Sequence, residues 1–391
     1  MKYLIYGLAI CILLAGCEKN EPKLPDQVTL NKKNLSENEV ALKNNLQKAA
    51  RLLTDIVRED AVIGELKAMS EESLTFDELS FKDLMASTKG TGELFPALRE
   101  RFLQACSSDE AKGPIEDLAK YLADNDCYIY CPYPLSFYPK GTGTFTVASH
   151  PIDNEYDGPG YRYEGRKLVE VTVNEKYTDK YPVLLIMPKD QDKEDNLGLV
   201  KEEITPSKGD PIYEVRIGEI RCADYCGGLF EGDLELRIVR GYPDYNLTTG
   251  AIGGTTANIT PIDYPRSYAK AAINGWTVHS NGGWYQAYLI WDSNWKTTKT
   301  QQCILVYEYD HVKESTISAT VGYKVDNVSP SVSVSLKISY YGDLLGLTEW
   351  DRAWFFATNT KPGPYDEVRN GWTVRKTCNE LKLTTPVTII Y

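Results

Sequence analysis

The chain has 391 residues, of which 42% are hydrophobic and 25% are charged, and its formal net charge is −12. Such a composition is typical of a globular protein of two or three domains and excludes an intrinsically disordered chain. The negative charge repels phosphate backbones, so we expect no nucleic-acid partner.

The N-terminus has the pattern of an export signal. A single basic residue, Lys2, precedes an apolar run over residues 3–14. This run is too short to span the ~30 Å hydrocarbon core of a bilayer as a permanent helix. We therefore predict that residues 1–16 are a signal peptide that is removed from the mature protein.

The apolar run ends in Leu14-Ala15-Gly16-Cys17, so two small residues precede a cysteine. This stretch resembles the lipobox of bacterial lipoproteins. The resemblance implies cleavage between Gly16 and Cys17 and attachment of a lipid to the Cys17 thiol. The acids just after the cysteine resemble the surface-export signal of Bacteroidetes-type lipoproteins. We expect a lipid-anchored protein of the outer membrane, on its surface or its periplasmic face. The alternative is an ordinary secretory signal with a chance cysteine.

Residues 17–35 are polar and contain two prolines, which predicts a flexible tether behind the anchor. Beyond the tether, Ser36 and Glu39 have the spacing of a helix capping box. Apolar residues then recur at helical spacing over residues 42–63. Such a stripe usually faces a core, and further helix starts follow. We therefore predict a small helical domain over residues 36–126.

From Cys127 onward, runs that favour strands replace the helical stripes. We predict a β-rich segment over residues 127–210, with a buried run at 183–187. Over residues 211–391 apolar and polar positions alternate with a period of two, which indicates sheets with one solvated face. Strands without intervening helices favour an antiparallel β-sandwich, so the predicted fold class is α+β.

Three further patterns refine this prediction. The glycine-rich segment 241–283 is predicted to form long loops. The alternating runs 317–325 and 332–338 are predicted to pair as a hairpin. The pentapeptide Asn-Gly-Trp-Thr-Val occurs at residues 274–278 and again at 370–374. We favour two uses of the same turn chemistry over two equivalent edges that present Trp to a ligand.

The chain has nine cysteines, of which one lies in the signal peptide and one is the anchor. The seven that remain are an odd number, so at least one stays unpaired within the monomer. Four of them form two pairs with a spacing of four residues, Cys127 with Cys131 and Cys222 with Cys226. We interpret both pairs as candidate disulfides of an exported chain. Buried free thiols and a four-cysteine zinc site are the alternatives.

Signals of catalysis and of metal binding are weak. The chain has three histidines and lacks the motifs of zinc hydrolases and of serine nucleophiles. The acidic run at residues 190–196 hints at calcium, but it lacks the residues that an EF-hand requires at its sixth and twelfth positions. We expect no metal and no cofactor, and we favour a noncatalytic protein. A hydrolase with paired carboxylates is an alternative, because acids are abundant.

Aromatic residues are concentrated between residues 276 and 295. They are the best candidate for a ligand-binding surface, because exposed rings can stack on sugars or peptides. Burial in a sandwich core, with the rings anchoring loops, is the interpretation that we favour. The candidates are Trp276, Trp284, Tyr288, Trp291 and Trp295.

The leading hypothesis is a lipid-anchored, noncatalytic binding or structural module of unknown ligand. Its rivals are a surface glycan-binding lipoprotein that uses exposed aromatics and the carboxylate-dependent hydrolase. The expected partners are the membrane, through the lipid, and a glycan or a protein.

Overall fold

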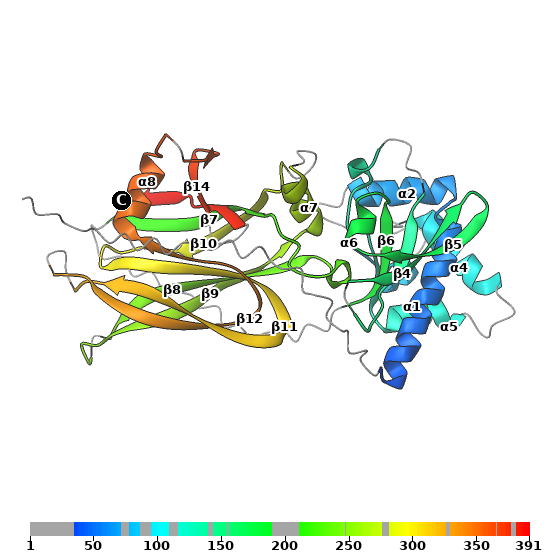
Figure 1. The fold of residues 1–391 in the computed structure, drawn as a ribbon, viewed down its shortest axis with the longest axis horizontal. Helices are drawn as coiled ribbons and strands as arrows, with labels where there is room; N and C mark the ends of the chain where they lie inside the picture. Colours follow the sequence, from blue (N-terminus) through cyan, green and yellow to red (C-terminus); the bar gives the residue numbers. More distant parts are fainter. Residues whose placement is uncertain are drawn as a thin grey trace, which may run out of the picture.

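The computed structural model describes residues 35–71, 78–86, 95–108, 116–139, 144–154, 156–189, 211–246, 248–275, 281–325, 329–364, 366–376 and 381–391. These residues form two bodies that lie end to end along the long axis of the molecule (Figure 1). We call residues 35–189 the N-body and residues 211–391 the C-body. The fold class is α+β with mostly antiparallel sheets, which confirms the prediction.

Helices begin the N-body, and the first of them starts where the sequence predicts. The Ser36 Oγ accepts the Glu39 N–H, and the Glu39 carboxylate accepts the Ser36 N–H. This capping box opens α1 (Glu37–Ile56), whose apolar stripe is buried. The next helices are α2 (Asp60–Glu71), α3 (Phe81–Ala86), α4 (Pro96–Ser108) and α5 (Glu116–Asp124).

One sheet forms the centre of the N-body. Its strands lie in the order β1-β2-β6-β3-β4-β5, and all neighbours are antiparallel except β3 and β6. The strands are β1 (Glu78–Ser80), β2 (Cys127–Tyr130), β3 (Thr146–Ser149), β4 (Gly158–Glu164), β5 (Lys167–Val173) and β6 (Val183–Pro188). A short helix, α6 (Glu175–Thr178), joins β5 to β6 on the side that faces the C-body.

Both faces of this sheet are buried. In β6, Leu184 and Ile186 belong to the core under the helices, whereas Leu185 and Met187 belong to a second core on the opposite face. A strand buried on both faces has a continuous apolar run, which is the pattern of residues 183–187. The helices and the strands after Cys127 therefore share one core.

The described part of the C-body contains two sheets packed as a sandwich. Their orders are β10-β7-β15-β14-β13, with β16 also paired to β7, and β12-β11-β8-β9. The strands are β7 (Ile212–Cys222), β8 (Leu234–Tyr245), β9 (Ile252–Tyr264), β10 (Tyr285–Asp292), β11 (Lys299–Tyr323), β12 (Val332–Asp351), β13 (Val368–Arg369), β14 (Trp372–Lys376), β15 (Leu381–Thr384) and β16 (Val387–Ile390). Residues from both sheets, such as Ile217 and Ile304, meet in one core.

Two helices of the C-body flank this sandwich. The helix α7 (Arg266–Asn274) lies between the bodies and α8 (Arg352–Thr360) lies at the far end (Figure 1). The strand β9 and the helix α7 occupy much of the segment 241–283. The prediction of long loops there is therefore wrong, because the glycines of β9 are tolerated inside a strand.

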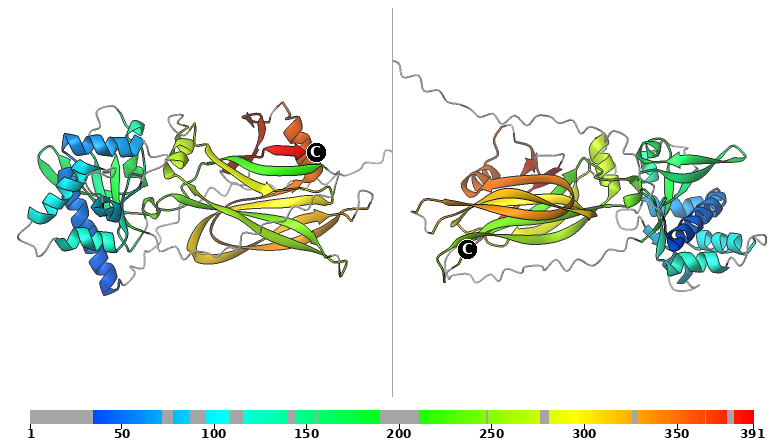
Figure 2. Two further views of the ribbon diagram at one scale, coloured as in Figure 1. Left: turned by 180° about the vertical axis from the view of Figure 1, so that it is seen from behind. Right: turned by 60° about the horizontal axis from the view of Figure 1, so that its bottom comes forward.

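The β11–β12 hairpin folds back over the sandwich. The predicted pairing is present, with Val321 opposite Val334. The register shifts between Tyr309 and Glu314, as at a β-bulge that bends a strand. Leu336 in the far half of the hairpin packs in the same core as residues of its near half. Figure 2 shows the curved hairpin from two sides.

A buried ion pair lies inside the sandwich. The side chains of Arg240 on β8 and Asp292 on β10 are 4% and 0% exposed, and their Nη1 and Oδ1 atoms are 3.3 Å apart. Gln302 Nε2 donates to Asp292 Oδ2 at 2.7 Å, and Arg240 Nη1 donates to the Trp291 carbonyl at 2.8 Å. These contacts compensate for the loss of water around both charges.

Replacing Arg240 with Met should lower the free energy of unfolding of the C-body by about 3–5 kcal/mol, because Asp292 would remain as a buried charge without its cation. Urea unfolding measures this difference. The control is Arg216→Met, which breaks the more exposed pair with Glu214 in the same body and should cost less than about 1 kcal/mol. Equal losses in both variants would contradict the prediction.

Candidate functional site at the junction of the two bodies

The aromatic residues singled out from the sequence do not form one surface. Trp291 and Trp295 are 1% and 0% exposed and belong to the sandwich core. The Trp291 ring contacts Trp350 edge-on at 5.1 Å, and the Trp295 ring lies 4.9 Å from Phe355. Neither ring can stack on a ligand in this arrangement.

The other aromatic candidates have different surroundings. Trp284 is 9% exposed and lies 4.7 Å beneath the guanidinium of Arg369. Tyr288 is exposed on β10, and Trp276 lies outside the described residues. The structure therefore brings no row of open rings together among the described candidates.

The two copies of the repeated pentapeptide have different structural roles. Asn370 and Gly371 have φ values of 50° and 84° and form the two-residue turn between β13 and β14. This is the tight turn that Asn-Gly favours. In the first copy, Gly275 has a φ of 68° and ends α7. Asn-Gly thus ends a helix in the first copy and forms a hairpin turn in the second, while residues 276–278 of the first copy lie outside the described residues.

The described cysteines are buried free thiols, namely Cys106, Cys127, Cys131, Cys222, Cys226 and Cys303. The extended strand β2 starts at Cys127 and ends just before Cys131. At ~3.3 Å per residue, its three steps alone separate Cα atoms by about 10 Å. A disulfide needs Cα atoms within about 7 Å, so a bond between Cys127 and Cys131 is excluded. By contrast, the thiols of Cys222 and Cys226 are hydrogen-bonded to each other.

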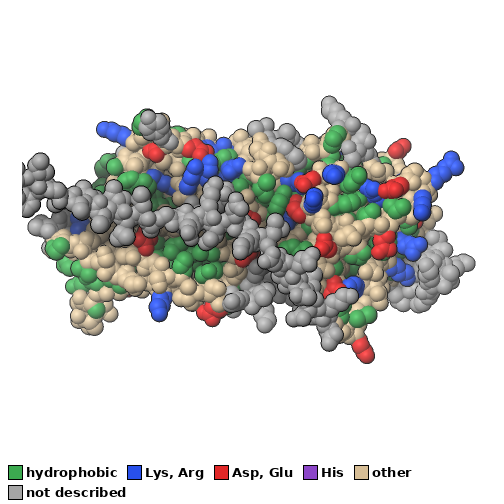
Figure 3. Space-filling model, viewed as in Figure 1, with side chains coloured by type: hydrophobic (Ala, Val, Ile, Leu, Met, Phe, Trp, Pro, Cys, Tyr) green, Lys and Arg blue, Asp and Glu red, His purple; other side chains and the backbone are tan. Residues whose placement is uncertain are grey.

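Several other predictions fall on residues that the structure does not describe. Gly16, Cys17, the tether up to residue 34 and the acidic run 190–196 lie outside the described residues. Within the described ranges, no group of three or more His, Cys, Asp or Glu side chains is placed to hold a metal ion. The same ranges contain no helix that is both long and apolar enough to cross a membrane. Figure 3 shows basic and acidic side chains interspersed on the visible face.

The two bodies meet through an apolar contact centred on Phe230. A 3-10 turn of the C-body, η2 (Leu229–Glu231), places Phe230 in the second core of the N-body sheet together with Tyr130 and Leu185. Phe230 is only 1% exposed. A Cβ atom on Gly158 of β4 would lie 2.2 Å from Phe230 Cζ. The phenyl ring thus covers a sheet face that water would otherwise contact.

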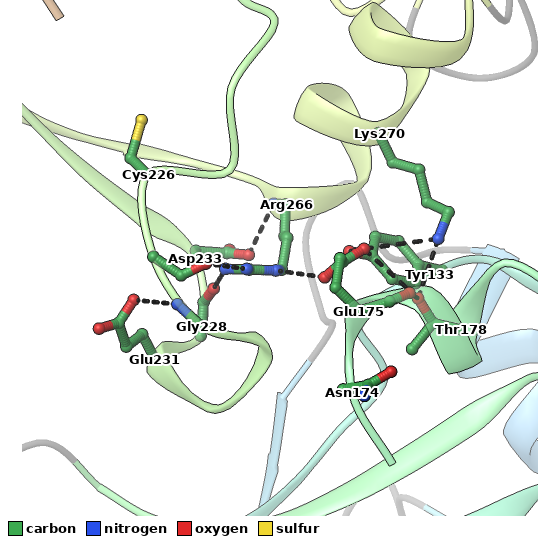
Figure 4. Close-up of polar contacts among 12 residues, drawn as sticks. Tyr133, Asn174, Glu175, Thr178, Cys226, Gly228, Glu231, Asp233, Arg266 and Lys270 are labelled. Carbon is green, nitrogen blue, oxygen red and sulfur yellow. Dashed lines mark hydrogen bonds and ion pairs between the residues drawn. The ribbon is translucent and has the colours of Figure 1, made fainter. Parts of the chain in front are cut away.

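Arg266, the first residue of α7, is the buried cation at the centre of this junction (Figure 4). Its side chain is 1% exposed, and its Nε lies 3.3 Å from Glu175 Oε2 of the N-body. Nη1 and Nη2 donate to the carbonyls of Gly232 and Gly227, each at 3.1 Å. The Arg266 backbone N–H donates to Asp233 Oδ1 at 2.9 Å. One guanidinium therefore ties the C-body turn to the N-body helix α6.

Glu175 also forms an ion pair with a second cation and accepts a hydrogen bond from a hydroxyl. Lys270, one turn after Arg266 and 1% exposed, has its Nζ 3.5 Å from Glu175 Oε1 and 3.0 Å from Asp179 Oδ1. The Tyr133 hydroxyl donates to Glu175 Oε1 at 2.5 Å, and Lys270 Nζ lies 4.0 Å from the centre of the Tyr133 ring. We call Arg266, Lys270, Glu175 and Tyr133 the junction cluster.

Two members of the junction cluster, Arg266 and Tyr133, have pKa values that their surroundings raise. Burial lowers the pKa of Arg266, but Tyr133 and Glu175 outweigh this effect and the pKa is raised overall. Burial, and then the Glu175 charge, raise the pKa of Tyr133 well above its usual range. General acid–base catalysis favours a pKa near the working pH. Arg266 and Tyr133 are therefore suited to binding Glu175 and not to transferring protons.

One carboxyl at the junction behaves differently. Glu78 of β1 has a pKa raised to about 7 by burial and by the negative charges of Asp233 and Asp263, against the opposing charge of Lys189. Asp233 itself accepts the Tyr130 hydroxyl at 2.7 Å. Acids of both bodies thus gather next to the junction cluster.

His150, which follows β3, contacts the C-body as a neutral ring. Its imidazole meets the Phe230 ring edge-on at 5.9 Å, and its Nδ1 accepts the Ile152 N–H at 2.9 Å. Burial lowers the pKa of His150 from its ordinary 6.5 to about 4, despite the opposing effects of Asp153 and of a hydrogen bond to the Phe230 backbone. A charged imidazole would therefore weaken the junction.

Only a weak signal in the sequence points to the junction cluster, because Pro265 can open a helix in which Arg266 and Lys270 are four residues apart and share a face. Alanines at 269, 271 and 272 support burial of that helix. The position of the acidic partner, 91 residues earlier in the chain, has no local signal.

Comparison of the chain with protein-family models, with curated proteins and with solved structures finds no match. The geometry of the junction is therefore the basis on which its role is inferred. Charged groups from both bodies bind one another there, around an apolar contact that closes the second core of the N-body.

Replacing Arg266 with Met should loosen the junction while each body keeps its core. Glu175 and the carbonyls of the C-body turn would lose their donor in a buried place, and breaking such a pair costs about 3–5 kcal/mol. Hydrogen-exchange mass spectrometry should show lost protection in residues 127–133 and 225–233, with little change in β11 and β12.

The matched control is Lys382→Met, which removes a surface pair with Glu367 in the same body. This variant should leave protection at the junction unchanged, because exposed pairs contribute little. Loss of protection throughout the chain in Arg266→Met would mean that the cluster stabilises the whole fold and not the junction.

The lowered pKa of His150 predicts how the stability of the protein depends on pH. Because its folded pKa lies below the ordinary value, its stabilising contribution is complete above pH 6.5 and is lost as the pH falls toward 4, by up to about 3 kcal/mol. Thermal unfolding of the wild type and of His150→Asn between pH 7 and 4 measures it. The stability of the variant should fall less steeply with acid, and parallel pH curves would contradict the prediction.

Proposed function

We propose that the chain is a lipid-anchored protein of the cell envelope that acts as a noncatalytic binding or structural module. The stretch that ends in Cys17 supports the anchor, since it resembles a lipobox. The polar residues 17–35 would then separate the folded bodies from the membrane.

The observation that carries the proposal is that the buried charges at the junction form ion pairs with one another. Arg266 and Lys270 of one body are both bound to Glu175 of the other. A junction with an apolar centre and paired buried charges favours one rigid unit over two bodies that move around a site. Rigidity suits a protein that presents a surface or spaces other components.

Two buried acids of the C-body, Glu219 and Asp292, support a noncatalytic role in the same way, because each is bound by an arginine. Glu219 is 5% exposed and accepts both Nε and Nη2 of Arg369 at 2.8 Å, together with Asn370 Nδ2. Asp292 is bound by Arg240. The hydrolase alternative would depend on Glu78, the acid whose pKa lies near 7. The burial of Trp291 and Trp295 argues against a glycan stacked on those two rings.

Replacing Cys17 with Ser should abolish incorporation of radiolabelled palmitate, because the thiol that would carry the lipid is gone. The protein should then leave the membrane fraction after cell lysis. Cys11→Ser is the control, since this residue lies within the apolar run of the signal and its substitution should leave labelling intact. Label retained in Cys17→Ser would overturn the anchor.

A further inference from the structure

Two buried thiols lie side by side where the C-body turns toward the junction. Cys222 ends β7, and Cys226 follows after a three-residue turn. Both side chains belong to the sandwich core, and a hydrogen bond joins their thiols. The thiols of Cys127 and Cys131 donate to backbone carbonyls, whereas Cys226 has the thiol of Cys222 as its partner.

The turn between them is built to keep the sulfurs on the same side. The Asp224 carboxylate accepts the Cys226 N–H at 3.1 Å, and the Cys222 thiol donates to the Asp224 carbonyl at 3.5 Å. Cys226 has a φ of 50°, which reverses the chain direction. Tyr264 holds the other end of the turn, because its hydroxyl accepts the Cys222 N–H at 3.1 Å.

We propose that Cys222 and Cys226 form a disulfide when the chain folds under oxidising conditions, and that this bond fixes the turn that binds Arg266. The presence of the bond in cells rests on the proposed location in the envelope, where disulfides persist. The pair Cys127 and Cys131 has the same spacing in the sequence but cannot bond, since β2 is extended.

The reaction conserves atoms and electrons through thiol–disulfide exchange. One thiolate attacks a disulfide-bearing oxidant, such as oxidised glutathione, and releases one reduced thiolate. The second thiolate then attacks the mixed disulfide, forms the bond between the two sulfurs and releases the second reduced thiol. The two cysteines lose two protons and two electrons in total, and the oxidant receives them.

The chemistry places this step early in folding. In the folded, reduced protein the hydrogen bond with the Cys222 thiol raises the pKa of Cys226 well above its usual range, and burial adds to this effect. The thiolate is the attacking species, so native thiols react slowly. During folding the turn is still open to water and to the oxidant. The bond is therefore structural and does not cycle.

The turn at residues 222–226 is followed directly by residues that bind Arg266 at the junction. Gly227, next to Cys226, offers its carbonyl to Arg266, and the Gly228 N–H donates to Glu231 at 2.7 Å. Figure 4 shows Cys226 beside this turn. A covalent closure at residues 222–226 would restrict the unfolded chain and would fix the position of the Arg266 partners.

Trypsin gives a direct test, because each cysteine pair falls within one peptide. The full-length protein is unfolded in denaturant with reductant, refolded in a mixture of oxidised and reduced glutathione, and alkylated with N-ethylmaleimide in denaturant. Peptide 222–237 should carry no label until it is reduced and should then take two. Peptide 121–140, which contains Cys127 and Cys131, should take two labels at once and serves as the internal control.

Two labels on peptide 222–237 before reduction, or a bond from either cysteine to a third one, would overturn the proposal. The oxidised protein should also melt on the order of 4 °C higher than the reduced protein. A Cys222→Ser variant should lose that difference, and a difference that persists in this variant would assign it to other thiols. Because refolding is done in vitro, the result does not depend on palmitate labelling at Cys17, which tests the location separately.

Discussion

The buried guanidinium of Arg266 is the constraint on which the arrangement of the two bodies depends. A charge that is 1% exposed must find its counter-charge and its acceptors within the protein, because removing it from water costs several kcal/mol. Glu175 supplies the charge, and the carbonyls of Gly227 and Gly232 supply the acceptors. These partners lie in both bodies, so the cation can be satisfied only when the bodies are docked.

Apolar packing and the buried charges act together at this place. Phe230 fills the second core of the N-body sheet, and Tyr130 of that sheet donates to Asp233 beside it. The apolar contact favours docking without fixing a direction, because hydrophobic burial is non-directional and scales with area. The charged groups fix the orientation, since their hydrogen bonds tolerate little displacement.

The local features of this fold could be predicted from the sequence, whereas the junction could not. The capping box at Ser36, the buried run at 183–187 and the pairing of Val321 with Val334 follow from spacing and period. The aromatic candidates do not form an exposed surface. A period of two in the sequence predicts a strand, but it does not say which face of that strand is covered by the other sheet. Trp291 and Trp295 lie on the inner side of the sandwich, a fact that depends on how the sheets stack.

Glu175 shows most plainly which residues could not be recognised from the sequence. It starts a four-residue helix and looks like any exposed acid in the sequence. Its importance arises from residues that are distant along the chain, and no local rule connects them. The glycine-rich segment before Arg266 also concealed β9 and α7, since glycine weakens the strand signal without preventing pairing.

The sheet of the N-body, which is covered by helices on one face and by Phe230 on the other, has a consequence for synthesis. The first half of the chain leaves the ribosome with a second apolar sheet face, which includes Tyr130 and Leu185 and is completed only by Phe230. That face stays open until the turn at residues 229–231 has also been made. Until then, a chain of this length would expose part of an apolar sheet face to water, and such transiently exposed surfaces favour aggregation.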